Sequence, residues 1–155
     1  MGIVSFGVIV LSDLKLQSEP LPTLEKIQKL QAEMKPFACV PPEPVHHFAP
    51  GMYLRELSIP AGMLVVGKIH KHSHFLILSK GKAQVVSEFG NEIINSGHVS
   101  VSQAGVKRVV LAIEDCLFLT VHLNKSDSED LEVIESDHIE PEFANISESK
   151  KGSLS

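Results

Sequence analysis

From Val45 onward the chain alternates short apolar, β-prone runs with turn residues such as Pro60-Ala61-Gly62 and Lys80-Gly81. Short runs at regular spacing are typical of a β-sandwich or a small barrel. The pair Gly90-Asn91 predicts a hairpin turn. We therefore predict an all-β fold of seven or eight strands, in the runs Met52–Ile59, Met63–Ile69, Phe75–Leu78, Ala83–Phe89, Glu92–Ile94, Val99–Ser102, Arg108–Ile113 and Leu117–Leu123.

A different spacing precedes these runs. Apolar residues recur at intervals of three, three and four, at Leu24, Ile27, Leu30 and Met34. This spacing predicts an N-terminal α-helix of about three turns with one apolar face. Thr23 is a suitable N-cap, and the proline at position 36 is expected to end the helix.

The pattern divides the chain into three parts. Residues 1–44 form an N-terminal arm and helix, residues 45–124 the barrel, and residues 125–155 an acidic strap with a frayed tail. Within the arm, the apolar run Ile3–Leu11 is expected to be a strand or a docking segment. Within the strap, Asp130–Glu135 is expected to be helical or extended, and the polar residues Ala144–Ser155 are expected to fray.

The composition of the chain argues against nucleic acid and membrane as partners. The 155 residues carry a formal net charge of −5 and no basic run, which argues against nucleic acid as a partner. The apolar run near the N-terminus is too short to span a bilayer, which takes about 20 residues, and it lacks a basic flank, so no membrane partner is expected. The two cysteines, Cys39 and Cys116, form no C-x-x-C pair and are expected to be small buried residues.

Histidines stand at alternate positions within Gly67–Gly81, as His70, His72 and His74. On one continuous strand they share a face and can form part of a metal site, although a polar, solvent-facing strand edge explains them equally well. On a straight strand His70 and His74 lie about 13 Å apart, so only neighbouring pairs can converge on one ion. A further ligand must come from another strand, and His122 is the best candidate. The expected ion is Fe, Mn, Zn or Ni.

Arg108 offers a second kind of chemistry. Its guanidinium is expected either to clamp strands through a carboxylate, such as Glu56, or to bind an anion at the barrel mouth. Arg55 and Glu56 are adjacent on a predicted strand, so only one of them can face the interior. The sequence contains no nucleophile elbow, phosphate loop or H-E-x-x-H motif, so no catalytic residue is predicted.

Gly97, Gly105 and Arg108 follow the spacing of the second motif of the cupin family, which the barrel region resembles. The resemblance implies a single small jelly-roll β-barrel that holds a divalent metal through histidines and a glutamate. Residues Gln103, Arg108 and Ala112 replace the proline, histidine and asparagine of that motif. In the first motif, His74 occupies the glutamate position and Lys68 the position of the first histidine.

Longer strings resemble small cupin-like proteins of tailed bacteriophages. They include A-G-V-K-R-V-V at residues 104–110, T-V-H at 120–122 and F-A-P-G-M-Y at 48–53. This resemblance implies a viral protein in the host cytoplasm or the virion. Its expected partners are further copies of itself, as a homo-oligomer, or other phage proteins.

Two functional hypotheses follow. In the first, the protein is a non-catalytic virion or accessory interaction module, with a divalent metal as an optional component. In the second, it is a small metal-dependent enzyme, such as a dioxygenase, an isomerase or a sugar-modifying cupin. There His70, His72, His74 and His122 supply metal ligands, and Arg108 orients a small anionic substrate.

Overall fold

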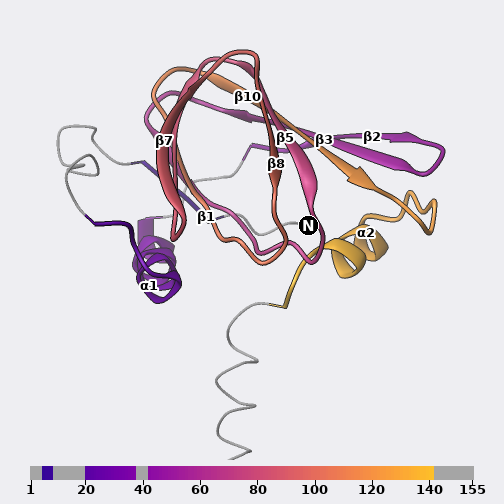
Figure 1. The fold of residues 1–155 in the computed structure, drawn as a ribbon, viewed down its shortest axis with the longest axis horizontal. Helices are drawn as coiled ribbons and strands as arrows, with labels where there is room; N and C mark the ends of the chain where they lie inside the picture. The colour runs from indigo at the N-terminus through magenta and orange to yellow at the C-terminus, as the bar shows by residue number, and fades with distance from the viewer. Residues whose placement is uncertain (1–4, 9–19, 38–41, 142–155) are drawn as a thin grey trace, which may run out of the picture.

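The computed structural model describes residues 5–8, 20–37 and 42–141, which form two five-stranded antiparallel sheets and two α-helices (Figure 1). Sheet I has the strand order β1-β4-β9-β6-β7 and sheet II the order β2-β3-β10-β5-β8. The strands are β1 (Ser5–Val8), β2 (Val45–Ala49), β3 (Met52–Ile59), β4 (Met63–Val66), β5 (His74–Lys80), β6 (Lys82–Ser87), β7 (Gly90–Asn95), β8 (His98–Ser102), β9 (Val109–Ala112) and β10 (Cys116–Leu123).

The order of these strands is that of a jelly roll. Strands β3, β10, β5 and β8 are neighbours in sheet II, and β4, β9, β6 and β7 are neighbours in sheet I, so the chain crosses repeatedly between the sheets. Eight strands wound in this way form two Greek keys. Strands β1 and β2 each add one edge strand. The predicted all-β class and jelly-roll architecture are therefore confirmed.

The predicted N-terminal helix is also confirmed, as α1 (Leu24–Met34). The Thr23 hydroxyl caps it by accepting a hydrogen bond from the backbone N–H of Lys26, at 3.3 Å. After Met34 the chain tightens into a 3-10 turn, Lys35–Phe37, which contains the expected proline. Buried Ile27 and Met34 pack against the outer face of sheet I, so this helix covers one side of the barrel.

The space between the sheets holds the main apolar core. Leu78 and Ala83 are fully buried there, and Ile59, Phe118 and Cys116 are nearly so. The Cys116 thiol donates to the carbonyl oxygens of Lys82 and Glu114, and burial raises its pKa, so this cysteine is the expected inert core residue. Cys39 lies outside the described residues.

Three local predictions were wrong. The hairpin turn after β6 consists of Glu88 and Phe89, because Ser87 pairs with Gly90 in the register. The continuous strand predicted through the histidines is broken: β4 ends at Val66 and β5 begins at His74. Because prolines closely precede them, the sequence predicts that His46 and His47 lie in a solvated loop, but they lie on β2.

Helix α2 (Leu131–His138) confirms that the predicted strap Asp130–Glu135 is helical. The side chain of Asp130 caps it by accepting from the backbone N–H of Glu132, at 2.9 Å. In Figure 1, α2 lies on the other side of the barrel from α1. Neither helix in the described part of the chain has the length and apolar character needed to cross a bilayer.

Candidate metal and anion site

On β3, β10 and β5, three neighbouring strands of sheet II, the inward-facing side chains change from apolar to polar along the strand. In β10 these positions run Cys116, Phe118, Thr120 and His122. Register pairing places Leu57 and Leu78 beside Phe118, whereas Arg55 and Leu76 lie beside Thr120 and Tyr53 lies beside His122. Because the side chains of a strand alternate between faces, one end of the barrel interior is apolar and the other end is polar.

The polar end contains a cavity of about 160 Å³. Its apolar floor is formed by core residues such as Leu57 and Phe118, and its walls carry histidine and arginine side chains. Helix α2 lies over it, contributing Ile134, Glu135 and His138. Lining residues come from both sheets and from α2: Tyr53, Arg55, Leu57, Ile59, Val65, Gly67, Lys68, His70, His74, Leu76, Val106, Arg108, Val110, Phe118, Thr120, His122, Ile134, Glu135, His138 and Ile139.

His70, His74 and His122 converge in this cavity. One ring nitrogen of each lies within 4.8 Å of the others. The ring centroids of His70 and His74 are 4.2 Å apart, and those of His74 and His122 are 4.5 Å apart. His74 and His122 are held by adjacent strands, whereas His70 lies in the segment that joins β4 to β5.

A bend between His70 and His74 makes this convergence possible. His70 forms an isolated β-bridge with Ile139, and its carbonyl oxygen accepts from the backbone N–H of Gly105 at 2.9 Å. These contacts fold the chain back on itself, so the separation of about 13 Å expected on a straight strand does not apply. The bend leaves His72 outside the three-histidine group.

The three imidazoles are held in the neutral form. Burial is the largest cause that lowers their pKa values, to about 3 for His70, about 4 for His74 and about 2 for His122. Repulsion among the rings and from Arg55 or Arg108 lowers them further. A neutral imidazole keeps one nitrogen lone pair, which is the form that binds a metal.

Each of these rings also has a contact that restrains its orientation. His74 Nδ1 lies 3.4 Å from the carbonyl oxygen of His72, and His122 Nε2 lies 2.9 Å from Thr120 Oγ1. A hydrogen bond with the backbone of Lys68 restrains the His70 ring. Such outer contacts normally fix the ring orientation of metal-binding histidines.

The donor set fits a first-row divalent metal. Three nitrogens bound to one ion at about 2.1 Å lie about 3.4–3.6 Å apart, so closing around an ion requires side-chain shifts of up to about 1 Å. Three neutral nitrogen donors suit Zn, Fe or Ni, and Mn less well, and they disfavour Mg or Ca, which prefer oxygen. The cluster can therefore hold one such ion through three histidines.

Two guanidinium groups share the cavity with the histidines. Burial is the main cause that lowers the pKa of both Arg55 and Arg108. Arg108 donates a hydrogen bond to the Ser102 hydroxyl, and no carboxylate within the described ranges lies within 4.0 Å of either guanidinium. The predicted carboxylate clamp of Arg108 is therefore not formed there.

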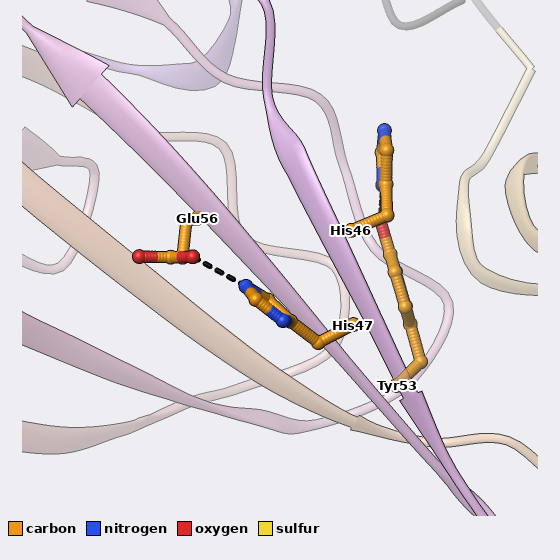
Figure 2. Close-up of polar contacts among 4 residues, drawn as sticks. All are labelled: His46, His47, Tyr53 and Glu56. Atoms are coloured by element: carbon orange, nitrogen blue, oxygen red, sulfur yellow. Dashed lines mark hydrogen bonds and ion pairs between the residues drawn. The ribbon is translucent and has the colours of Figure 1, made fainter.

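Glu56 faces the opposite side of the sheet. As expected from strand alternation, Arg55 points into the cavity and Glu56 points out, where it pairs with His47 of β2 (Figure 2). On the inward side, His46 Nδ1 lies 2.7 Å from the Tyr53 hydroxyl, and burial raises the pKa of Tyr53 to about 12. The Tyr53 ring stacks on His122, with the ring centroids 5.5 Å apart. Strand β2 therefore contacts the site indirectly, through His46 and Tyr53.

Residues of α2 close the mouth of the cavity, and sequence reasoning did not identify them as part of the site. Lys68 pairs with Glu135 across the opening, and the backbone N–H of Lys71 donates to the carbonyl oxygen of His138 at 2.8 Å. His138 contacts the carbonyl oxygens of Ile134 and Leu123 through its two ring nitrogens, which leaves neither free for a metal. The acidic strap sequence gave no signal that it would reach the histidines.

No protein-family model matches the sequence, and no curated protein matches it significantly. Solved structures with a similar fold include a cupin-2 domain containing protein from Shewanella frigidimarina NCIMB 400, at 14% identity and a TM-score of 0.47 over 60% of this chain and 91% of that chain. Ectoine synthase from P. lautus matches at 16% identity and a TM-score of 0.45, over 50% of this chain and 60% of that chain.

A third similar structure is an acetylacetone dioxygenase from Acinetobacter johnsonii, at 18% identity and a TM-score of 0.43 over 56% of this chain and 64% of that chain. This chain therefore covers less than two thirds of either enzyme. Similarity at these identities and TM-scores does not indicate an activity for this chain.

Proposed function

We propose that the protein is a small metal-dependent enzyme that acts on a small anion, with one divalent ion held by His70, His74 and His122. One observation carries this proposal: two partly buried guanidinium groups, which form no ion pair within 4.0 Å in the described ranges, lie beside three neutral histidines in one cavity. Glu135 attracts Arg55, and Glu92 attracts Arg108, only at longer range. A buried cation that is compensated incompletely costs free energy. A bound anion is the natural compensation for it.

A metal in the site strengthens this requirement. A divalent ion beside Arg55 and Arg108 adds like charge in a region of low dielectric, where Coulomb repulsion is large. When bound, the ion supplies Lewis-acid or redox chemistry at an oxygen atom of the anion. Arg55 and Arg108 orient the anion through paired N–H donors, as guanidinium groups do with carboxylates.

The size of the cavity limits the ligand. A volume of about 160 Å³ resembles that of cavities that hold a molecule about as large as benzene. The apolar floor accepts a short carbon skeleton, and helix α2 lines the cavity through Ile134, Glu135 and His138. The ligand class that fits is a small carboxylic acid with a short carbon skeleton.

The test measures metal and anion binding on one untagged protein. We expect about one Fe, Mn, Zn or Ni per chain by elemental analysis, and loss of that metal in His74→Ala and in His122→Ala. His72→Ala is the matched control, because His72 lies outside the group and this variant should keep its metal. Metal-loaded protein should bind oxalate or pyruvate in a calorimeter, but should not bind the neutral analogue oxamide.

Two outcomes would reject the proposal. One is wild-type protein that takes up none of the four metals. The other is equal loss of metal from His72→Ala and His74→Ala, which would mean that the histidines do not act as the structure arranges them.

The second candidate is the non-catalytic interaction module implied by the phage resemblance. An exposed apolar face on sheet II favours it. On this reading the metal is structural and metal-loaded protein turns over no small acid. Phage origin, host cytoplasm and virion stay predictions, which mass spectrometry of purified phage particles and of infected-cell cytoplasm can check.

A further inference from the structure

The outward-facing side of sheet II is apolar over all five of its strands. Pairing in the register aligns Val101, Phe75, Val121 and Leu54 in one row across the sheet. The next row contains Val99, Ile77 and Leu119. Outward positions of a sheet that faces water are normally polar, so this face differs from an ordinary solvated surface.

Much of this face is exposed. Six of its apolar residues are more than half accessible: Val45 53%, Met52 52%, Phe75 51%, Val99 59%, Val101 51% and Leu123 63%. Together these six expose on the order of 500–600 Å² of mostly apolar surface, which is at the upper limit for the largest patch on an ordinary monomer.

Sheet I has an equally apolar outer face, but the chain covers it. Leu64, Val66 and Leu111 are at most 3% exposed, because Ile27 and Met34 of α1 pack over them. The second helix, α2, lies over the cavity at the end of the barrel. The described part of the chain therefore supplies no element that covers sheet II.

We propose that a second copy of this chain covers the face, so that two sheets II pack against each other around a twofold axis. The charges permit this arrangement. Within the two rows the ionisable side chains are His47 and Glu56, which already pair with each other (Figure 2). Two such faces can meet without opposing like charges, even though each chain carries a net charge of −5.

The area and the geometry also suit a dimer. With the half-buried residues Leu54, Ile77, Leu119 and Val121 included, the face approaches the roughly 800 Å² per partner of a standard interface. Two copies of one sheet have the same twist, and identical twisted sheets pack well at about −30°. A twofold axis also closes the assembly, so no apolar face is left to recruit further chains.

Light scattering after gel filtration tests the proposal. We expect wild-type protein at micromolar concentration to have twice the 16.9 kDa mass of the chain. Val101→Asp, at the edge strand β8, should weaken the dimer by at least about 100-fold, because it buries a charge in an apolar interface. Phe89→Asp is the matched control, because Phe89 is 71% exposed on the turn between β6 and β7, and this variant should remain a dimer.

A measurement on wild-type protein tests the proposal even if a variant fails to fold. Amide hydrogen exchange in strands β5 and β8 of sheet II of wild-type protein should become faster on dilution, while exchange in β6 of sheet I should stay constant. A wild-type monomer would overturn the proposal, as would a dimer that Phe89→Asp disrupts and Val101→Asp does not. The proposal is independent of the metal site, since no residue in the two rows lines the cavity.

Discussion

The two ends of the barrel interior are built by the same strands and behave as opposites. At the closed end, Ile59, Leu78 and Phe118 fill the space between the sheets with packed apolar side chains. At the open end, the same three strands contribute Arg55, His74 and His122 around a cavity. A shift of four residues along a strand, about 13 Å, separates the core from the site.

The closed end stabilises the fold, and the open end holds the polar groups that can do chemistry. The closed end supplies hydrophobic free energy, because its described core side chains are apolar apart from the Cys116 thiol. At the open end, neutral histidines and two cations are kept away from water, which costs free energy until a ligand compensates. Packing at the closed end stabilises the strands. The open end can therefore hold histidines and arginines whose burial lowers the stability of the fold.

The largest expected effect is on the closed end. Leu78 is fully buried in the core, and Leu78→Ala should lower the free energy of unfolding by about 2–5 kcal/mol, through lost burial and a new cavity. The matched variant is Leu76→Ala, two residues along β5 and already beside the cavity, which should cost less than half as much. Urea unfolding followed by circular dichroism measures both. Equal losses would mean that the two ends do not differ in packing.

Acidification should act on the opposite end. The pKa values of His70, His74 and His122 are lowered to between about 2 and about 4 in the folded protein, against 6.5 without the surroundings. The unfolded chain therefore binds more protons below pH 6.5, and stability falls as pH falls toward the folded pKa values. We expect metal-free protein to lose about 2–4 kcal/mol between pH 7 and pH 5.5.

The check compares unfolding of wild type with His122→Gln at both pH values. Removing one of the three titrating rings should reduce the pH-dependent loss by about a third. His46, whose pKa burial also lowers, adds a contribution of the same sign and is unchanged in both proteins. A loss that His122→Gln leaves unaltered would mean that His122 is not held neutral.

The closed end could be predicted from the sequence more completely than the open end. Short β-prone runs between turn residues predicted β3 and β10, and helical spacing predicted α1. The alternation of side chains along a strand predicted that Arg55 and Glu56 face opposite sides, as they do. These features depend on neighbours in the sequence, where side-chain periodicity alone decides the outcome.

The open end depends on contacts between distant segments. The bend that brings His70 to His74 is held by Ile139 and Gly105, 69 and 35 residues further along the chain. No local pattern signals such a bend, so a continuous strand was the natural interpretation of Gly67–Gly81. His46 was misplaced for a related reason, because the prolines before Val45 obscured the start of β2.

The smallest expected effect is a gain in stability, and it tests whether the open end is built to bind an anion. Arg55 lines the cavity and forms no ion pair within 4.0 Å with any described residue, and Glu135 attracts it only at longer range. Replacing a poorly compensated buried charge by an apolar side chain of similar length relieves its desolvation. Arg55→Met should therefore stabilise the ligand-free protein by about 1 kcal/mol and weaken oxalate binding at least tenfold.

Glu56→Gln is the control for this change, because it alters the neighbouring residue on the outward face of the same strand. It should leave oxalate binding unchanged and shift stability by less than about 0.5 kcal/mol. Urea unfolding and calorimetry of both variants complete the comparison. If Arg55→Met destabilises the protein, the guanidinium is part of the framework, and the open end of the barrel is held together by its charges rather than prepared for an anion.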